Sequence, residues 1–513
     1  MYRRSTPEQL SFENFYLPFG GKLSKDNRWV KLAEVIPWQE FENEYAALFS
    51  EDMGAPAKEF RMALGALIIK EKLGTSDAET VEQIRENPYL QYFLGLWEYS
   101  DKAPFEASMM VHFRKRLGME MINRVNKHII CSVMVEDTST QTSEDNLSPK
   151  DECKTNSSDS GDNDDSDEGP SPPNAGALVV DATCAPADIR YPTDLGLLNE
   201  AREVSEEIID VLYEQVRDKE ATKPRTYRRK ARRQYLAVAK QRKPKAKTLR
   251  KAIGQQLRYL RRNLNHIDAL LAAGASLSLL SARQYRLLLV MSEVLRQQQL
   301  MYDKRIHRVE DRIVSLSQPH LRPIVRGKAG TPVEFGAKLA VSVTDGWVSL
   351  DVVSWDAFNE AEHLSEQIEA FKERCGHYPA SVHADQIYRT RANRAYCRER
   401  GIRLSGPPLG RPATDTLTEQ RQQTLADAKV RNQVEGKFGQ AKRRFSLNRV
   451  MTKLSNTSET AIAITFLVMN LERLLWALFF VLLSWAVGFT RCFWLAKVSY
   501  SQPNNLQHNP IAA

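Results

Sequence analysis

The chain has 513 residues, which is long enough for a large hydrophobic core and indicates two to four domains. Its six cysteines are scattered without a C-x-x-C pair, and its N-terminus has no signal-peptide pattern, which favours a reduced, cytoplasmic protein without a cysteine zinc site. The net charge of +8 is unevenly distributed, because residues 223–262 contain 17 Lys and Arg residues and no acid. A basic block of this kind usually contacts polyphosphate.

Residues 1–130 are predicted to form a helical N-terminal domain. Apolar side chains recur at helical spacing after Pro56, and further helices fit 78–87, 88–96 and 105–117. The last of these contains Arg114 and Arg116. A compact helical domain with a basic final helix is compatible with helix-turn-helix DNA binding, in which these two arginines would contact DNA. A helical packing domain with a solvated charged face explains the same pattern.

Residues 131–176 are predicted to be an acidic, disordered linker. From residue 136 on, Asp, Glu, Ser, Asn, Gly and Pro dominate and aromatic residues are absent. Such a segment cannot bury enough apolar surface to offset the entropy lost on ordering. It could also screen the basic block in the absence of DNA, although a plain spacer is the simpler interpretation.

Two short apolar runs, each followed by an aspartate, are predicted to be buried strands. The run ALVVDAT (177–183) places Asp181 at the tip of the first strand, and SVHAD (381–385) places Asp385 at the tip of the second. In an open α/β sheet, reactive groups gather at strand ends, so the two carboxylates are expected to converge.

The residues between and after these runs predict the remainder of an α/β layer fold. Residues 333–344 alternate between apolar and polar, and Asp345-Gly346 is a strong hairpin signal that leads into a strand over 347–355. Helices are expected over 361–374 and 390–400, and a short strand over 402–405. Residues 177–470 therefore predict a mixed sheet flanked by helices, which is the proposed catalytic domain.

A long helical insertion, residues 195–320, follows the first strand. Prolines 224 and 244 and the region around Gly274 interrupt it, and its centre is the basic block. Binding to DNA phosphates would neutralise this charge and release counterions, so affinity would depend strongly on salt. Binding to RNA or to other polyanions is the alternative. The candidate backbone contacts are Arg228, Arg229, Arg232 and Arg233.

A third acid, Glu435, lies on the predicted helix RNQVEGKFGQAKRRF (431–445). At about 100° per residue, Arg431, Glu435 and Lys442 fall within a stripe about 40° wide at the border of the apolar face. Two strand-borne aspartates and a helix-borne glutamate suit a pair of Mg²⁺ or Mn²⁺ ions that promote phosphodiester chemistry. Taken singly, each acid has a structural explanation, such as a Glu435–Arg431 pair or a strand-end cap. His383 could assist the site, but a structural role is simpler.

These residues resemble those of a known family. ALVVDAT with ADIRYPTD, SVHADQIYRT and RNQVEGKFGQAKRRF resemble the DDE transposases of bacterial insertion sequences, and residues 56–118 resemble that group's N-terminal helical domain. The resemblance implies a ribonuclease H-like catalytic core in which Asp181, Asp385 and Glu435 bind two metal ions. Arg431, Glu435 and Lys442 also fit a Tyr-x2-Arg-x3-Glu-x6-Lys signature, although Ala428 replaces its tyrosine.

The expected function is therefore a transposase that binds the ends of an insertion sequence and cleaves and joins DNA strands. Double-stranded DNA at the element ends and the target would be its partner, and a homodimer on nucleoid DNA in the cytoplasm its working form. One alternative is a metal-dependent nuclease or resolvase of the same fold. Another is a DNA-binding protein with an inactive core, against which the presence of all three acids argues.

Residues 471–513 are predicted to form a hydrophobic helix and a tail. Residues 474–490 contain no charge and lie between Arg473 and Arg491. A membrane-spanning helix needs about 20 apolar residues, with about 17 as the lower limit. We expect this helix to pack on the core or on a second subunit, with a membrane anchor as the alternative.

Overall fold

The computed structural model describes residues 2, 12–17, 20–50, 54, 56–141, 173–218, 222–325, 333–407 and 417–499. Within these ranges, the side chains of residues 12, 134–141, 417–420 and 478–499 are not described. Most of the linker predicted at 131–176 therefore lies outside the described residues. The chain divides into two compact units.

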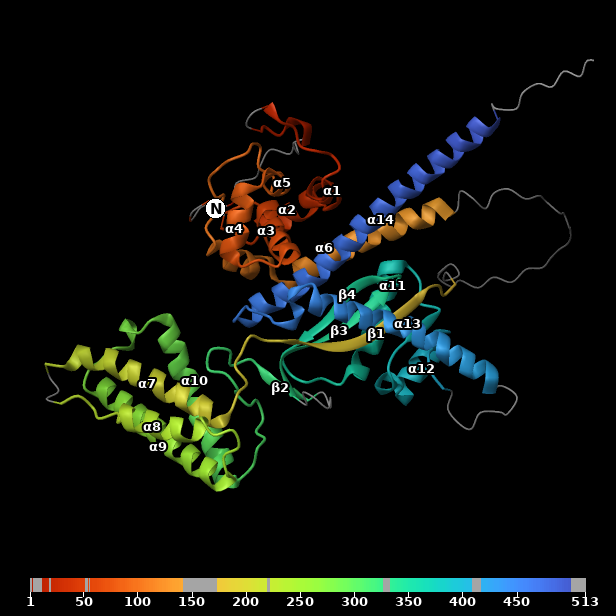
Figure 1. Cartoon of the computed structure of the whole chain (residues 1–513). Coiled ribbons are helices and arrows are strands. Elements are labelled where there is room, and N and C mark those ends of the chain that lie inside the picture. Colours follow the sequence, from red (N-terminus) through yellow and green to blue (C-terminus); the bar gives the residue numbers. More distant parts are fainter. Residues whose placement is uncertain are drawn as a thin grey trace, which may run out of the picture. The chain divides into compact units, whose positions relative to one another are not determined.

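The first unit contains the N-terminal helices, most of α6 and the part of α14 from Phe466 on (Figure 1). Several of these helices lie where the apolar pattern predicts them. Their bounds are α1 (Arg28–Val35), α2 (Trp38–Ala46), α3 (Phe60–Leu73), α4 (Asp77–Glu86), α5 (Pro88–Phe93), α6 (Met109–Gln141) and α14 (Ser455–Ser499).

Aromatic rings fill the centre of this unit. Trp38 lies edge-on to Phe93 with 5.5 Å between ring centroids, and Trp29 packs on the same Phe93 ring at 5.2 Å. Helix α14 contributes Glu472, which forms a buried ion pair with Lys72 at 3.0 Å. The hydrophobic helix near the C-terminus thus contains a charged side chain, Glu472, that is paired inside the protein.

Helix α14 runs without a break through residue 470, where we placed a boundary between the catalytic domain and the hydrophobic tail. Among the described residues, one helical segment, Ser455–Ala477, is long and apolar enough to cross a membrane, and 72% of its most apolar window is buried inside the protein. This is a test of length and composition only. The side chains of most of residues 474–490 lie outside the described part, so the predicted packing of this segment stays a prediction.

The second unit contains a mixed six-stranded sheet in the order β2-β3-β1-β5-β6, with β4 also paired to β3. Strand β3 is antiparallel to β1, β2 and β4, whereas β1, β5 and β6 run parallel. The mixed α/β fold that the sequence predicts is confirmed at this level. The strand bounds are β1 (Ala177–Pro186), β2 (Arg322–Val325), β3 (Val333–Thr344), β4 (Trp347–Ser354), β5 (Ser381–His383) and β6 (Arg403–Leu404).

Helices cover both faces of this sheet. Successive residues of a strand point to opposite faces, and Leu178 and Val180 of β1 pack with Leu364 of α11 (Leu364–Cys375). Asp181 therefore points to the other face, which α13 (Leu417–Arg443) covers. The connecting elements η4 (Glu360–His363), η5 (Gln386–Tyr388) and α12 (Arg391–Glu399) complete the α11 side.

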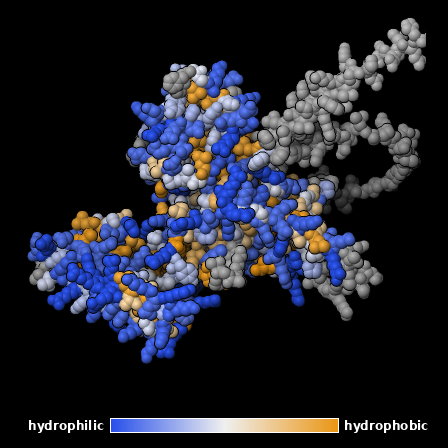
Figure 2. Space-filling view, in the orientation of Figure 1, coloured by the Kyte–Doolittle hydropathy of each residue, from blue (hydrophilic) through white to orange (hydrophobic). Residues whose placement is uncertain are grey.

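Four helices follow β1 and form a bundle with its own core, in the yellow-green part of Figure 1. The breaks between them fall at the prolines and the glycine that the sequence marks. Buried side chains from α7, α9 and α10 make up this core, and the outer surface is mainly hydrophilic (Figure 2). The bounds are α7 (Asp194–Val216), α8 (Arg228–Ala239), α9 (Ala246–Ala272) and α10 (Ala282–Lys304).

Candidate active site

Asp181 lies in the middle of β1, not at its tip as the sequence predicts. The strand continues to Pro186 because its antiparallel pairing with β3 extends from Leu178 to Pro186. The parallel pairing with β5 is much shorter and stops at Val179, opposite His383. Asp181 thus lies just beyond the last parallel pair, where no described strand lies beside that edge of β1.

Asp385 occupies the corresponding place on the neighbouring chain segment. It follows His383 of β5 by two residues, as Asp181 follows Val179 by two, so each aspartate lies two residues beyond the last parallel pair. Asp385 is exposed and forms the cap of η5. The prediction that the two aspartates emerge together at this part of the sheet is supported by the register.

Helix α13 brings the third acid to the same place. Val434 and Ala441 are fully buried and anchor the helix on the sheet, while the Glu435 side chain beside them is 61% exposed. The guanidinium of Arg431 donates to the Asp385 carboxylate and lies 3.8 Å from Oε1 of Glu435. The Glu435–Arg431 pair that the sequence left open is present, but Arg431 also bridges to Asp385.

A single cleft of about 580 Å³ is lined by Asp181, Asp385, Glu435 and Lys442. Two further charged residues, Lys338 of β3 and Glu360 of η4, line the same cleft. Lys338 Nζ lies 2.9 Å from Glu360 Oε1 and donates to the Phe358 carbonyl at 2.7 Å. Sequence reasoning missed both residues, because neither belongs to a local acid motif and only the tertiary fold brings them here.

The charges in this cleft are only partly balanced. The pKa of Asp181 is raised to about 6, mainly by burial and also by the neighbouring Glu360 and Asp385 carboxylates, whereas the backbone hydrogen bond from Ala182 and the charge of Arg431 oppose the shift. Asp385 and Glu435 share Arg431, and Glu360 has Lys338. The site therefore favours an additional positive charge near Asp181.

The donor chemistry of the cleft fits a hard divalent cation. All its acidic ligands are carboxylates, which Mg²⁺ and Mn²⁺ prefer to thiolate or imidazole sites. Within the described part of the chain, no three His, Cys, Asp or Glu side chains lie close enough to form a ready metal cluster.

His383 lies on the α13 face but does not line the cleft. It is buried, with Nε2 3.0 Å from Ser381 Oγ and Nδ1 3.5 Å from Asp427. Burial lowers its pKa, although Asp427 opposes the shift. Asp427 in turn accepts two hydrogen bonds from Arg403, at 2.9 and 3.0 Å. This network joins α13 to the sheet and supports a structural role for His383.

Arg114 is buried, so its side chain is not available for the DNA contact that the sequence predicts. Its side chain is only 6% exposed, and both terminal nitrogens donate to Asp77, so it holds α6 to α4. The sequence could not show this, because Asp77 comes from a different helix. Arg116 is exposed, donates to the Leu48 carbonyl at 3.1 Å and covers the Phe49 ring.

The arginines of α8 differ in their surroundings. Both terminal nitrogens of Arg228 donate to the carboxylate of Asp210 of α7, at 2.8 to 3.0 Å, so Arg228 joins two helices. Arg229, Arg232 and Arg233 are exposed on the same helix. Arg229 and Arg232 line a hollow with glutamates of α7. Arg228 is exposed as well, so all four arginines are accessible from solvent.

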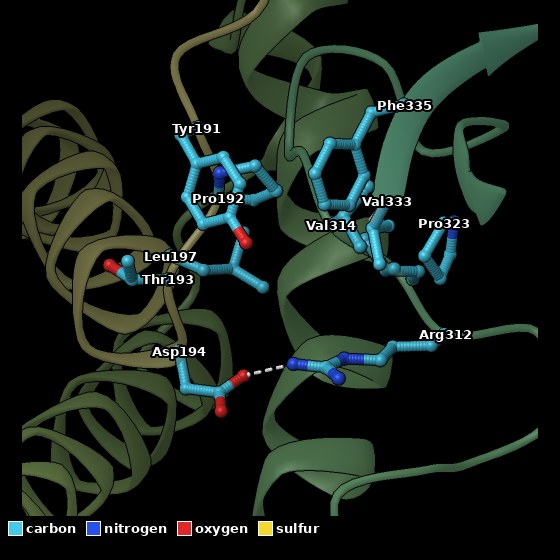
Figure 3. A pocket seen from close by; sticks show the side chains of 11 residues that line it. Tyr191, Pro192, Thr193, Asp194, Leu197, Arg312, Val314, Pro323, Val333 and Phe335 are labelled. Carbon is cyan, nitrogen blue, oxygen red and sulfur yellow. Dashed lines mark hydrogen bonds and ion pairs between the residues drawn. The ribbon is translucent and has the colours of Figure 1, made fainter. Parts of the chain in front are cut away.

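A second cavity, of about 190 Å³, lies where the helical bundle joins the sheet (Figure 3). Tyr191 and Phe335 meet edge-on across it with 5.6 Å between ring centroids. Below them, Arg312 donates to Asp194 at 2.6 Å. Because Asp194 begins α7 and Arg312 follows α10, this pair joins the two ends of the bundle.

The protein therefore has an α/β fold with an acidic cleft. Carboxylates from two adjacent strand segments and from a helix that crosses the sheet line this cleft. Two family models match this chain: "Transposase DDE domain" over residues 382–472 and "Transposase domain (DUF772)" over residues 18–116. Two segments of this chain are thus similar to transposase domains, and these matches support the resemblance to DDE transposases of insertion sequences that the motifs predict. The first match includes Asp385 and Glu435.

A protein of Rhizobium meliloti described as "Uncharacterized protein ORF8 in nfe locus" is 38% identical over 98 residues. The alignment covers 19% of this chain and 47% of that protein, so the chain spans about half the length of this relative. No solved structure matches this chain.

Proposed function

We propose that this protein binds the ends of an insertion sequence and catalyses metal-dependent cleavage and transfer of DNA strands. Asp181, Asp385 and Glu435 are its catalytic residues and metal ligands. The observation that carries the proposal is that these three acids, from β1, the end of β5 and α13, line one cleft. Divalent metals are general in the DDE transposase family; two Mg²⁺ or Mn²⁺ ions are our specific proposal.

When bound, two such ions supply charge stabilisation for the attacking and leaving oxygens of a phosphodiester. The chain's own residues bind and orient the strand. Lys442 lines the cleft with the acids, and Arg431 lies between Asp385 and Glu435. If Asp385 and Glu435 held a cation, the Arg431 guanidinium beside them would be placed to bind a DNA phosphate.

The other parts of the chain position DNA in this proposal. The sheet of residues 177–470 is the ribonuclease H-like core, which its mixed parallel and antiparallel pairing supports. The bundle of residues 195–320 binds the DNA backbone through Arg229, Arg232 and Arg233, with Arg228 also holding α8 to Asp210. Residues 1–130 bind the element ends, where the exposed Arg116 replaces Arg114 as candidate contact. The working form is a homodimer on nucleoid DNA in the cytoplasm.

The test is a strand-transfer assay with terminal DNA, with and without a supplied 3′-OH. Asp181→Asn, Asp385→Asn and Glu435→Gln should each reduce cleavage and joining by several orders of magnitude and leave DNA binding intact, because each removes a charged metal ligand. Near-normal cleavage by Glu435→Gln in Mg²⁺ would overturn the site. Cleavage without joining would favour a nuclease or resolvase, and DNA binding without cleavage a protein with an inactive core.

A further inference from the structure

Tyr388, three residues after Asp385, has a buried hydroxyl without a hydrogen-bond partner among the described residues. The residue is fully enclosed in the core cluster on the α11 face, and the backbone around it is held by Asn393, which donates to the Tyr388 carbonyl at 2.9 Å. Buried hydroxyl groups are normally paired. A Phe would fill the same apolar space, so packing alone does not explain the hydroxyl.

The hydroxyl end of Tyr388 lies among acids. Element η5, which contains Tyr388, packs against η4, which contains Glu360. Burial raises the pKa of Tyr388 well above its usual range, and the negative charges that raise it further are those of Glu360, Asp181, Asp351 and Asp385, in falling order. Three of these four acids line the candidate active-site cleft.

Two of the four acids already have strong partners of their own. Asp351 accepts from Ser342 Oγ at 3.0 Å and from Gln367 Nε2 at 2.7 Å, on the α11 face of the sheet. Asp385 accepts from Arg431. Glu360 and Asp181 also have partners, Lys338 and the Ala182 N–H, but each of these contacts involves a single carboxylate oxygen, and Glu360 is the strongest electrostatic neighbour of Tyr388.

Glu360 itself lines the cleft. Its side chain is 20% exposed, and its contact with Lys338 involves the oxygen Oε1. It also affects the Asp181 carboxylate more strongly than any other neighbouring charge. A carboxylate this close to Asp181 either repels it or shares a cation with it.

We propose that Glu360 and Tyr388 are positioning residues of the cation site. Glu360 is a fourth carboxylate beside Asp181, and the Tyr388 hydroxyl donates to it when the site is loaded. This inference rests on the proposed function, because it assigns residues to the same cation site. It also explains why a hydroxyl unpartnered in the metal-free protein is kept inside the core.

The test uses the full chain and Mn²⁺ alone, with affinity measured by calorimetry and stability by thermal unfolding. Tyr388→Phe should leave the melting temperature of the metal-free protein unchanged or higher, because it removes a hydroxyl without a partner. It should weaken Mn²⁺ binding several-fold. Glu360→Gln should also weaken Mn²⁺ binding several-fold, and the double variant should bind Mn²⁺ no more weakly than Glu360→Gln alone.

Two control variants match these changes outside the cleft. Tyr396→Phe removes a hydroxyl that donates to Glu369, so it should lower stability and leave Mn²⁺ affinity unchanged. Glu362→Gln changes a glutamate of the same η4 turn that does not line the cleft. Unchanged Mn²⁺ affinity in Tyr388→Phe would overturn the inference, as would a loss equal to that of Tyr396→Phe. If the unaltered chain does not bind Mn²⁺, the proposed function itself fails.

Discussion

The guanidinium of Arg431 donates to the carboxylate of Asp385 and thereby ties helix α13 to the chain that leaves β5. The same guanidinium lies 3.8 Å from Glu435, one helical turn further along α13. Two of the three proposed metal ligands are therefore held by one cation that belongs to the protein. If the proposed site binds a metal ion, this ion pair would compete with it for the same carboxylates.

Replacement of Arg431 should separate the contribution of this ion pair to stability from its effect on metal binding. Arg431→Gln should lower the stability of the metal-free protein by less than about 1 kcal/mol, because both partners are substantially exposed. It should also raise Mn²⁺ affinity several-fold, because the cation no longer displaces the guanidinium. Calorimetry and thermal unfolding measure both. Arg443→Gln is the control, since Arg443 lies on α13 and donates only to the Gly439 carbonyl among its described contacts. Weaker Mn²⁺ binding by Arg431→Gln would contradict the competition.

Asp181 predicts a pH dependence that an amide should remove. Its pKa in the folded protein is about 6, above the ordinary value of 3.8, so the folded state binds the proton more tightly than the unfolded state. The metal-free protein should therefore lose stability as pH rises from about 4 through about 6. The loss is at most about 3 kcal/mol and is reduced by the partial exposure of the carboxylate.

Asp181→Asn should accordingly be more stable than the unaltered chain at pH 7.5 without metal, and this advantage should disappear towards pH 4. In the unaltered chain, Mn²⁺ affinity should fall as pH is lowered through 6, since a proton competes for Asp181. Thermal unfolding and calorimetry at pH 5.5, 6.5 and 7.5 measure the two effects. A stability difference that does not vary with pH would show that Asp181 is ionised throughout.

The exposed arginines of α8 should contribute to DNA binding of any sequence. Simultaneous replacement of Arg229, Arg232 and Arg233 by alanine should weaken binding uniformly and reduce the salt slope by up to about three units, roughly 0.9 for each phosphate that is no longer neutralised. Fluorescence anisotropy over a series of salt concentrations measures the slope. A matched control removes three exposed arginines from another helix of the bundle, Arg283, Arg286 and Arg296 of α10. If the control variant reduced the salt slope equally, the effect would reflect the loss of positive charge in general and not contacts made by α8.

Asp194 and Arg312 should couple the two ends of the helical bundle. Asp194 also accepts from Gln298 Nε2 at 2.9 Å, so its replacement loosens α7 from both α10 and the segment that follows it. A double-mutant cycle of Asp194→Ala and Arg312→Ala should give a coupling energy of about 1 kcal/mol. Amide hydrogen exchange of α7 and α10 reports it. The exposed pair Glu214–Arg217, 3.7 Å apart, should couple by nearly zero. Additive effects at Asp194 and Arg312 would contradict the prediction.

Elements specified by local sequence could be predicted. Strand β3 has the predicted bounds, and Asp345 and Gly346 both have positive φ, 47° and 78°, as the predicted two-residue hairpin requires. The three breaks between the four bundle helices contain the prolines and the glycine that interrupt the pattern. In each case the turn residues and the periodic apolar residues lie close together in the sequence, so the local sequence is enough to predict the element.

Features that depend on partners distant in sequence could not be predicted. Strand β1 continues past Asp181 because β3, far along the chain, pairs with it up to Pro186. Arg114 is buried because Asp77 of another helix binds it. Glu360 and Lys338 enter the cleft only through the tertiary fold. The motifs identified three acids of the cleft, but not the residues that surround them.

The bundle of α7 to α10 closes its core from neighbouring segments, whereas the acid cleft needs β1, the end of β5 and α13 together. Local contacts form faster than contacts between distant segments. During synthesis, the bundle is therefore expected to fold as soon as it leaves the ribosome, while the cleft waits for α13 near the C-terminus. Under the proposed function, an unfinished chain would therefore form its DNA-binding bundle before its catalytic cleft, so an incompletely synthesised copy would not cut DNA.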